Sequence, residues 1–115
     1  MQTNPTKVLT GIPTIDEIKE AFAPILRRGG AIKAILFGSY ANGIADRYSD
    51  IDLIIVVDTD LKWTRRYELF EGLIQAWPRA MDVLIYTPQE FDTMLAEGRA
   101  FLEDAVQQGV VIYEE

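Results

Sequence analysis

Two kinds of hydrophobic pattern alternate along this chain. Short, nearly continuous apolar runs rich in isoleucine, leucine and valine are typical of buried strands. We expect these strands at residues 31–37, 51–57, 81–86 and 110–113. Between them, apolar residues recur every three or four positions, which indicates amphipathic helices. We expect the helices at residues 15–28, 63–77 and 88–108. The resulting order of elements predicts an α/β or α+β domain with one sheet.

Capping and breaking residues set the ends of the expected helices. Thr14 and Thr87 each precede a glutamate by three positions, which is the pattern of a capping box, and Pro88 fills the first helical position after Thr87. We expect Pro24 to kink or divide the first helix, because proline cannot donate the helical hydrogen bond. A break in the last helix is expected near Gly98.

The segment 63–77 carries two features that are open to more than one interpretation. Its aromatic and aliphatic stripe, from Trp63 to Trp77, is predicted to pack in the core rather than to hold an adenine ring. Arg65 and Arg66 are adjacent, so they form either a local basic patch or two exposed helix positions.

Length and charge narrow the class of protein. With 115 residues, the chain is long enough for one domain, 1–115, in which residues 1–13 form a loose lead-in. No apolar run approaches the roughly 20 residues that span a bilayer, and the start lacks the apolar stretch of a signal peptide, so we expect a cytoplasmic protein without membrane contact. The net charge of −7 argues against long nucleic acid as a partner.

Two absences restrict the possible chemistry. The chain has no cysteine, which excludes disulfides, thiolate zinc sites and thiol nucleophiles. It has no histidine, which excludes Ser-His-Asp catalysis and imidazole metal ligands. Any chemistry therefore depends on carboxylates, hydroxyls, lysines, arginines and a bound ion.

Two acids begin the second predicted strand. Asp50 and Asp52 point to the same face, because side chains alternate along a strand, whereas Ile51 points to the other. Two carboxylates held close together repel each other, so one must be protonated or a cation must lie between them. Hard oxygen ligands of this kind suit Mg²⁺ or Mn²⁺.

Three more residues extend this candidate site. If the strand of Asp82 neighbours that of Asp52, the acids can form a three-carboxylate cluster, the arrangement that holds two metal ions in phosphoryl and nucleotidyl transfer. Gly38 and Ser39 end the first strand, where glycine permits close approach of a phosphate and a hydroxyl can bind its oxygens. Each signal alone is weak: D-x-D can be a loop, G-S a turn and Asp82 an edge-strand acid. At average frequencies, G-S followed after ten residues by D-x-D arises in roughly one chain in a thousand of this length.

This combination of Gly38-Ser39, Asp50-Ile51-Asp52 and a later Asp82 resembles the DNA polymerase β-type nucleotidyltransferase superfamily, and the small size resembles its minimal nucleotidyltransferases (MNT). The resemblance implies a mixed sheet of about four strands with helices packed on it. It implies that Asp50 and Asp52 bind two Mg²⁺ ions and that Asp82 helps to bind the ion beside the attacking hydroxyl. Gly38 and Ser39 would then hold the β- and γ-phosphates of ATP.

The resemblance also implies a biological role. Many MNT proteins of prokaryotes are encoded beside a HEPN-domain RNase toxin and act as its antitoxin, and characterised members transfer AMP from ATP to a tyrosine of the toxin. Two alternatives remain open: a binding module that neutralises its partner by contact alone, and a small-molecule nucleotidyltransferase, which usually carries an added helical domain. The chain departs from the family's frequent G-S-x-A-R-G at Asn42, and Arg47 is a nearby candidate to replace that cation. Assembly with itself or a partner is expected through the last two helices.

Overall fold

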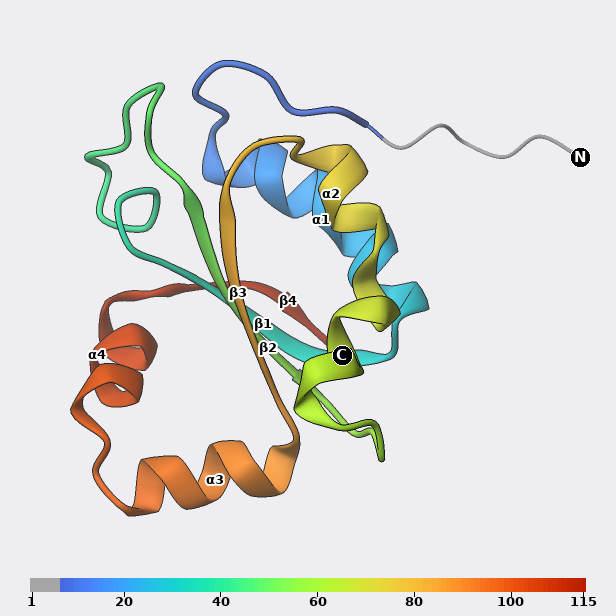
Figure 1. Cartoon of the computed structure of the whole chain (residues 1–115). Helices are drawn as coiled ribbons and strands as arrows, with labels where there is room; N and C mark the ends of the chain where they lie inside the picture. Colours follow the sequence, from blue (N-terminus) through green and yellow to red (C-terminus); the bar gives the residue numbers. More distant parts are fainter. Residues whose placement is uncertain (1–6) are drawn as a thin grey trace, which may run out of the picture.

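The computed structural model describes residues 7–115, which form one mixed sheet with helices on both faces (Figure 1). The elements in chain order are α1 (Ile15–Arg28), β1 (Ala31–Phe37), β2 (Ile51–Val57), the 3₁₀ helix η1 (Trp63–Phe70), α2 (Gly72–Ala76), β3 (Met81–Tyr86), α3 (Pro88–Ala96), α4 (Ala100–Gln108) and β4 (Val110–Glu114). Within residues 7–115, no helix has both the length and the apolar character needed to cross a membrane.

The sheet combines parallel and antiparallel pairs. Its strand order is β3-β2-β1-β4, with β1 antiparallel to both β2 and β4, and β2 parallel to β3. The expectation of a mixed, four-stranded sheet covered by helices is confirmed. β3 and β4 are its outer strands, so β1 and β2 lie in the middle, where their nearly continuous apolar sequences are buried.

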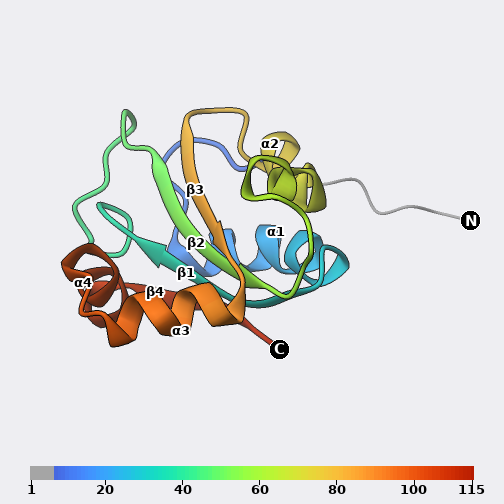
Figure 2. The same ribbon diagram turned by 60° about the horizontal axis from the view of Figure 1, so that its bottom comes forward.

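Each face of the sheet has its own hydrophobic core. The strands lie between α1 and α2 on one side and α3 and α4 on the other, as Figures 1 and 2 show. Alternate residues of one strand supply the two cores: Leu53 and Ile55 belong to the larger cluster under α1 and α2, whereas Ile54 and Val56 belong to the smaller cluster under α3 and α4. The two cores thus fix the register of β2, because a slip of one residue would exchange its faces.

The helix boundaries follow the capping signals. In both capping boxes, the threonine hydroxyl accepts the glutamate N–H and the glutamate carboxylate accepts the threonine N–H. Of the two effects expected of Pro24, a kink or a division of the helix, the division is wrong, because α1 continues through Pro24 to Arg28. Pro24 lies on the exposed side, where water can satisfy the freed carbonyl, and buried side chains such as Phe22 and Leu26 hold the helix to the sheet.

Two predicted helices are each split in two. The expected break at Gly98 is confirmed, since α3 ends at Ala96 and α4 begins at Ala100. The continuous helix 63–77 is wrong: this segment forms η1 and then α2. With its tighter turn, the 3₁₀ helix does not keep the stripe on one face, and Trp63 is 76% exposed whereas Trp77 is fully buried.

The lead-in is less loose than its sequence indicates. Residues 1–6 lie outside the described part of the chain, and residues 7–13 form no helix or strand. Nevertheless, Leu9 is buried in the larger core, and its N–H donates to the Ala76 carbonyl oxygen at 2.8 Å. This segment is therefore packed against the end of α2.

Candidate active site

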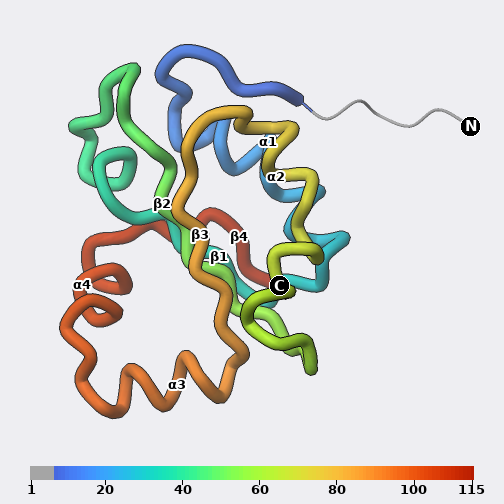
Figure 3. The backbone as a smooth tube through the Cα atoms, viewed as in Figure 1, coloured from blue at the N-terminus to red at the C-terminus, as the bar shows by residue number. Residues whose placement is uncertain are grey.

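The predicted site residues gather at one end of the sheet. Because β1 runs antiparallel to β2 and β2 runs parallel to β3, the end of β1 lies beside the beginnings of β2 and β3. Asp52 is the register partner of Asp82. Gly38 and Ser39 follow β1 directly, and the loop that they open returns to β2 through Asp50 (Figure 3).

The acids occupy the open end of one sheet face. By strand alternation, Asp52 and Asp82 share a face with Ile54 and Leu84, which pack in the core under α3 and α4. Since α3 starts where β3 ends, it covers the opposite end of this face. Asp82 is exposed and Asp52 is partly buried, so a ligand in solution can reach both carboxylates.

The electrostatics of Asp52 show that this end carries unbalanced negative charge. Its pKa is raised from the usual 3.8 to about 6. Partial burial is the largest cause, followed by the negative charge of Asp82, a hydrogen bond between these two carboxyl groups, and the charge of Asp50. Asp82 therefore affects Asp52 more strongly than Asp50 does, although the sequence spacing had singled out Asp50.

Gly38 brings the backbone against Asp52. Its φ of +77° lies in the left-handed region, and a Cβ at this position would overlap with the carboxylate oxygen Oδ2 of Asp52. The following turn is closed by two backbone bonds of 3.1 Å each, from the Asn42 N–H to the Gly38 carbonyl and from the Ile44 N–H to the Ser39 carbonyl. Glycine is thus needed at the point where the phosphate-binding turn and the acid pair are expected to meet.

The fit of the acids to a metal ion can be judged from their chemistry. Asp52 and Asp82 are neighbouring hard oxygen donors with surplus negative charge, which is the donor set that Mg²⁺ or Mn²⁺ prefers. However, residues 7–115 contain no group of three or more acidic, histidine or cysteine side chains already arranged to hold a metal. The structure therefore makes Asp52 and Asp82 neighbours on adjacent strands, and the charge of Asp50 acts on Asp52 more weakly than that of Asp82 does.

A small hydrogen-bonded turn presents Asp50 to the site. The Asp46 side chain accepts a bond from the Tyr48 N–H at 2.8 Å, and the Ser49 hydroxyl accepts one from the Asp46 N–H at 2.9 Å. A backbone bond from the Ser49 N–H to the Asp46 carbonyl closes the same turn at 3.1 Å. These side-chain-to-backbone bonds are typical of turns that begin with aspartate, and they fix the chain immediately before Asp50.

Arg47, the candidate to replace the arginine that is frequent at position 42 in the family, interacts with Tyr48. Asn42 is exposed. The Arg47 guanidinium lies 5.0 Å from the centre of the Tyr48 ring and donates to the Tyr48 hydroxyl at 2.9 Å. In this conformation Arg47 is engaged with its neighbour in the exposed part of the loop.

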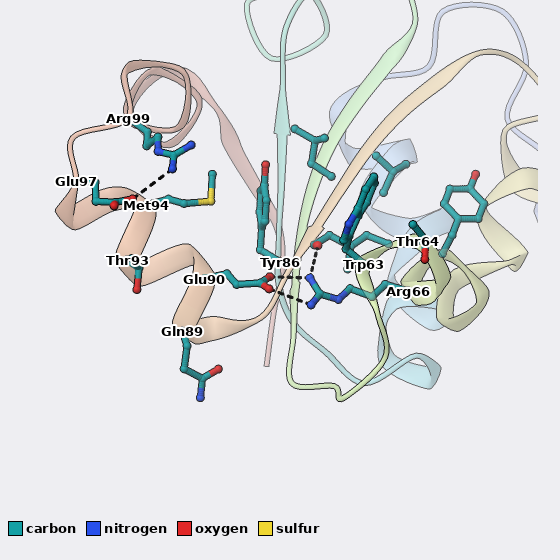
Figure 4. A pocket seen from close by; sticks show the side chains of 14 residues that line it. Trp63, Thr64, Arg66, Tyr86, Gln89, Glu90, Thr93, Met94, Glu97 and Arg99 are labelled. Carbon is teal, nitrogen blue, oxygen red and sulfur yellow. Dashed lines mark hydrogen bonds and ion pairs between the residues drawn. The ribbon is translucent and has the colours of Figure 1, made fainter.

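A groove of about 790 Å³ lies away from these acids, along the outer edge of β3 between η1 and α3 (Figure 4). None of the five predicted site residues lines it. Its wall includes Arg66, which donates to both carboxylate oxygens of Glu90 at 2.6 and 3.0 Å and to the carbonyls of Leu61 and Ile85 at 3.1 and 3.0 Å. Arg66 is only 7% exposed, so the interpretation of Arg65-Arg66 as a patch or an exposed pair is wrong for Arg66.

Three comparisons with known proteins agree with this geometry. The family described as "Polymerase beta, Nucleotidyltransferase" matches residues 20–115. The "Putative protein adenylyltransferase MJ0604" of Methanocaldococcus jannaschii is 30% identical over 86 residues, which cover 75% of this chain and 82% of that protein. A crystal structure of a toxin–antitoxin with AMP-PNP is 26% identical with a TM-score of 0.58, covering 86% of this chain and 73% of that one. A mutant of the toxin–antitoxin MntA-HpeT has a TM-score of 0.57 over 90% of this chain and 75% of that one, and at 23% identity it supports the fold alone.

Proposed function

The chain belongs to the polymerase β-type nucleotidyltransferase family, among the minimal nucleotidyltransferases, and from this premise we propose that it transfers AMP from ATP to a protein hydroxyl. The observation that carries the proposal is the pairing of Asp52 with Asp82 across β2 and β3, with the Gly38 backbone held against Asp52. Residues 1–115 are proposed to act as one domain, in the cytoplasm.

The five predicted residues have distinct roles in this proposal. Asp50, Asp52 and Asp82 hold Mg²⁺, with two ions expected, and Gly38 and Ser39 bind the β- and γ-phosphates. Bound Mg²⁺ would neutralise phosphate charge and lower the pKa of the acceptor hydroxyl. The acceptor oxygen bonds to the α-phosphorus, the bond to pyrophosphate breaks, and the hydroxyl proton leaves on the side of Asp82, which is exposed at the end of the sheet.

The partner is proposed to be a toxin. One similar structure is a toxin–antitoxin with AMP-PNP, and one similar protein is named as an adenylyltransferase of proteins. We propose that the acceptor is a tyrosine of a HEPN-type RNase and that AMP transfer inactivates it. A tyrosine hydroxyl, with a pKa near 10, ionises more readily than an alcohol. The net charge of −7 suits a partner with a basic surface.

One observation favours a second candidate, an antitoxin that acts by contact alone. Residues 7–115 hold no group of three acids already arranged for a metal, so catalysis requires the three carboxylates to converge when the ion and ATP bind. A contact antitoxin would need no such movement.

Mass spectrometry of the toxin partner distinguishes these two functions. The partner is incubated with ATP, Mg²⁺ and either the native chain or an Asp50→Ala/Asp52→Ala variant. The matched control is Asp58→Ala/Asp60→Ala, because these acids have the same spacing, are exposed, and lie at the opposite end of β2. We expect mass steps of one AMP with the native chain and the control, and none with the site variant. If the native chain adds no mass while all three chains still neutralise the partner, the contact function replaces the transferase.

A further inference from the structure

We propose that Arg79, seated on Trp77, is a positioning residue that fixes the loop of residues 38–50 in the arrangement needed for metal and ATP binding. The proposal rests on the proposed function, since it assigns a support to the same site. Both residues belong to the short segment between α2 and β3, which leads into Asp82.

Arg79 ties together segments that are far apart in the sequence. One terminal nitrogen of its guanidinium donates to the Gly11 carbonyl at 2.7 Å, and the other donates to the Arg47 carbonyl at 2.9 Å. The guanidinium lies 4.0 Å from the centre of the Trp77 ring, within the range of a cation–π interaction. The Arg47 carbonyl belongs to the turn that presents Asp50, so Arg79 holds the returning end of the loop.

Trp77 holds the beginning of the same loop. It is fully buried, its indole N–H donates to the Ala80 carbonyl at 3.0 Å, and its ring meets Tyr40 edge to face at 5.9 Å. Tyr40 is 4% exposed and directly follows Ser39. Among the described residues, the buried Tyr40 hydroxyl has no hydrogen-bond partner, so packing on Trp77 and its neighbours keeps this ring in place.

Both halves of the G-S and D-x-D motif are therefore attached to the segment that precedes the third acid. Trp77 contacts the residue after Gly38-Ser39, Arg79 binds the loop before Asp50, and β3 begins two positions after Arg79. Because Asp50 ends this loop, whereas Asp52 and Asp82 are paired on neighbouring strands, the position of the loop sets how close the third carboxylate comes to the other two. Arginine suits this role, since its planar fork can bond two carbonyls at once while stacking on a ring, which lysine cannot do.

Three variants separate positioning from general stability. Arg79→Ala removes the fork, Arg79→Lys keeps only the charge, and Arg65→Ala is the control, because Arg65 makes an exposed ion pair with Glu68 on η1. Two of the readouts need no catalysis: hydrogen exchange of the Tyr48 and Ser49 amides, and binding of Mn²⁺ with a non-hydrolysable ATP analogue. AMP transfer is the third readout, and thermal unfolding reports whether each variant is folded.

In Arg79→Ala, we expect both amides to exchange about 10-fold faster and Mn²⁺ with the analogue to bind about 10-fold more weakly, the size of effect that supporting residues have at metal sites. AMP transfer should fall by a similar factor, Arg79→Lys should recover only part of each change, and Arg65→Ala should match the native chain. Unchanged exchange and binding in Arg79→Ala, whatever its thermal midpoint, would overturn the proposal and leave Arg79 as an anchor for the lead-in. If instead the native chain transfers no AMP, the proposed function fails, whereas the exchange experiment still decides the role of Arg79.

Discussion

Two charged clusters lie at opposite ends of β3, and they differ in whether their charges balance. Near its end, the buried Arg66 guanidinium meets both oxygens of Glu90 and two backbone carbonyls. At its beginning, Asp82 is paired with Asp52. Within residues 7–115, neither of these two carboxylates forms an ion pair with a lysine or arginine. The first cluster is complete as folded, whereas the second would gain from a positive ligand.

The directions of the pKa shifts express the same difference. Hydrogen bonds from Arg66 are the largest cause that lowers the pKa of Glu90, so this carboxylate is stabilised in its charged form. Burial and the neighbouring acids raise the pKa of Asp52 to about 6, so its charged form is disfavoured. The Arg66–Glu90 ion pair therefore has a structural role, whereas the raised pKa of Asp52 makes the Asp52–Asp82 pair a candidate functional site.

The largest expected effect is on catalysis at the unbalanced cluster. Asp52→Asn should reduce AMP transfer by about 10²–10³-fold, because in the proposed function it removes a carboxylate that would hold the metal ion. The same change should leave the thermal midpoint unchanged or higher, since it relieves repulsion with Asp82. Transfer assays and thermal unfolding of one preparation check both parts; a variant that is both active and destabilised would contradict the comparison.

Gly38 offers a sharper test, because a second glycine provides a matched control. Gly38 and Gly43 have φ values of +77° and +74°, but only at Gly38 would a Cβ meet Asp52. Each alanine variant should lose about 1 kcal/mol of stability from backbone strain. We expect Gly38→Ala alone to reduce AMP transfer, by about 10-fold or more, since only its Cβ displaces a site carboxylate. Equal losses of activity in the two variants would show that strain, and not the contact with Asp52, is responsible.

At the balanced cluster, the expected effect is on stability. Glu90→Gln keeps a side-chain acceptor for the capping box at Thr87 but leaves the Arg66 charge without its carboxylate. Because Glu90 is partly exposed, we expect a loss of about 1–2 kcal/mol in unfolding free energy rather than the full cost of a buried pair. AMP transfer by the folded variant should stay within about twofold of native. Denaturant unfolding measures the loss of stability, and transfer assays without denaturant measure the activity.

The smallest expected effect is a dependence of stability on pH, because solvent around the partly exposed Asp52 screens its interactions. Since the folded-state pKa of Asp52 lies above its unfolded value of 3.8, the folded chain holds this proton more tightly. Its stabilising contribution is therefore present below about pH 4 and is lost as pH rises through about 6. Subtracting the unfolding free energy of Asp52→Asn from that of the native chain, between pH 4 and 7, should give a difference that falls with pH. A difference that rises with pH would mean that the charged form of Asp52 is favoured.

The strands and caps could be predicted from the sequence because their signals are local. Apolar runs fixed β1 to β4 to within about one residue, and threonine–glutamate spacing located the starts of α1 and α3. The prediction of one continuous helix at residues 63–77 was wrong, because hydrophobic periodicity does not show how this segment packs against β3. The buried Arg66 pairs with Glu90, which lies 24 positions away, and no local pattern in the sequence indicates that pairing.

The proximity of two candidate acids could be predicted from the sequence, whereas the path of the loop that carries Asp50 could not. The expectation that the strand of Asp82 neighbours that of Asp52 is confirmed, and the two acids are register partners. That Asp82 affects Asp52 more strongly than Asp50 does depends on the path of the loop, which Trp77 and Arg79 contact from another segment. Arg79 binds Gly11 and Arg47, which lie 68 and 32 positions away, so its role is visible only in three dimensions.

The most direct test of the central claim is a carbon-13 NMR titration of the Asp52 carboxyl group, with and without Mg²⁺ and a non-hydrolysable ATP analogue. The account predicts an apparent pKa of about 6 for the free chain and a clearly lower value once the cation and analogue are bound, because a metal ligand must be ionised. An Asp52 pKa that does not respond to the cation and analogue would contradict the claim that the acid pair is the metal and nucleotide site.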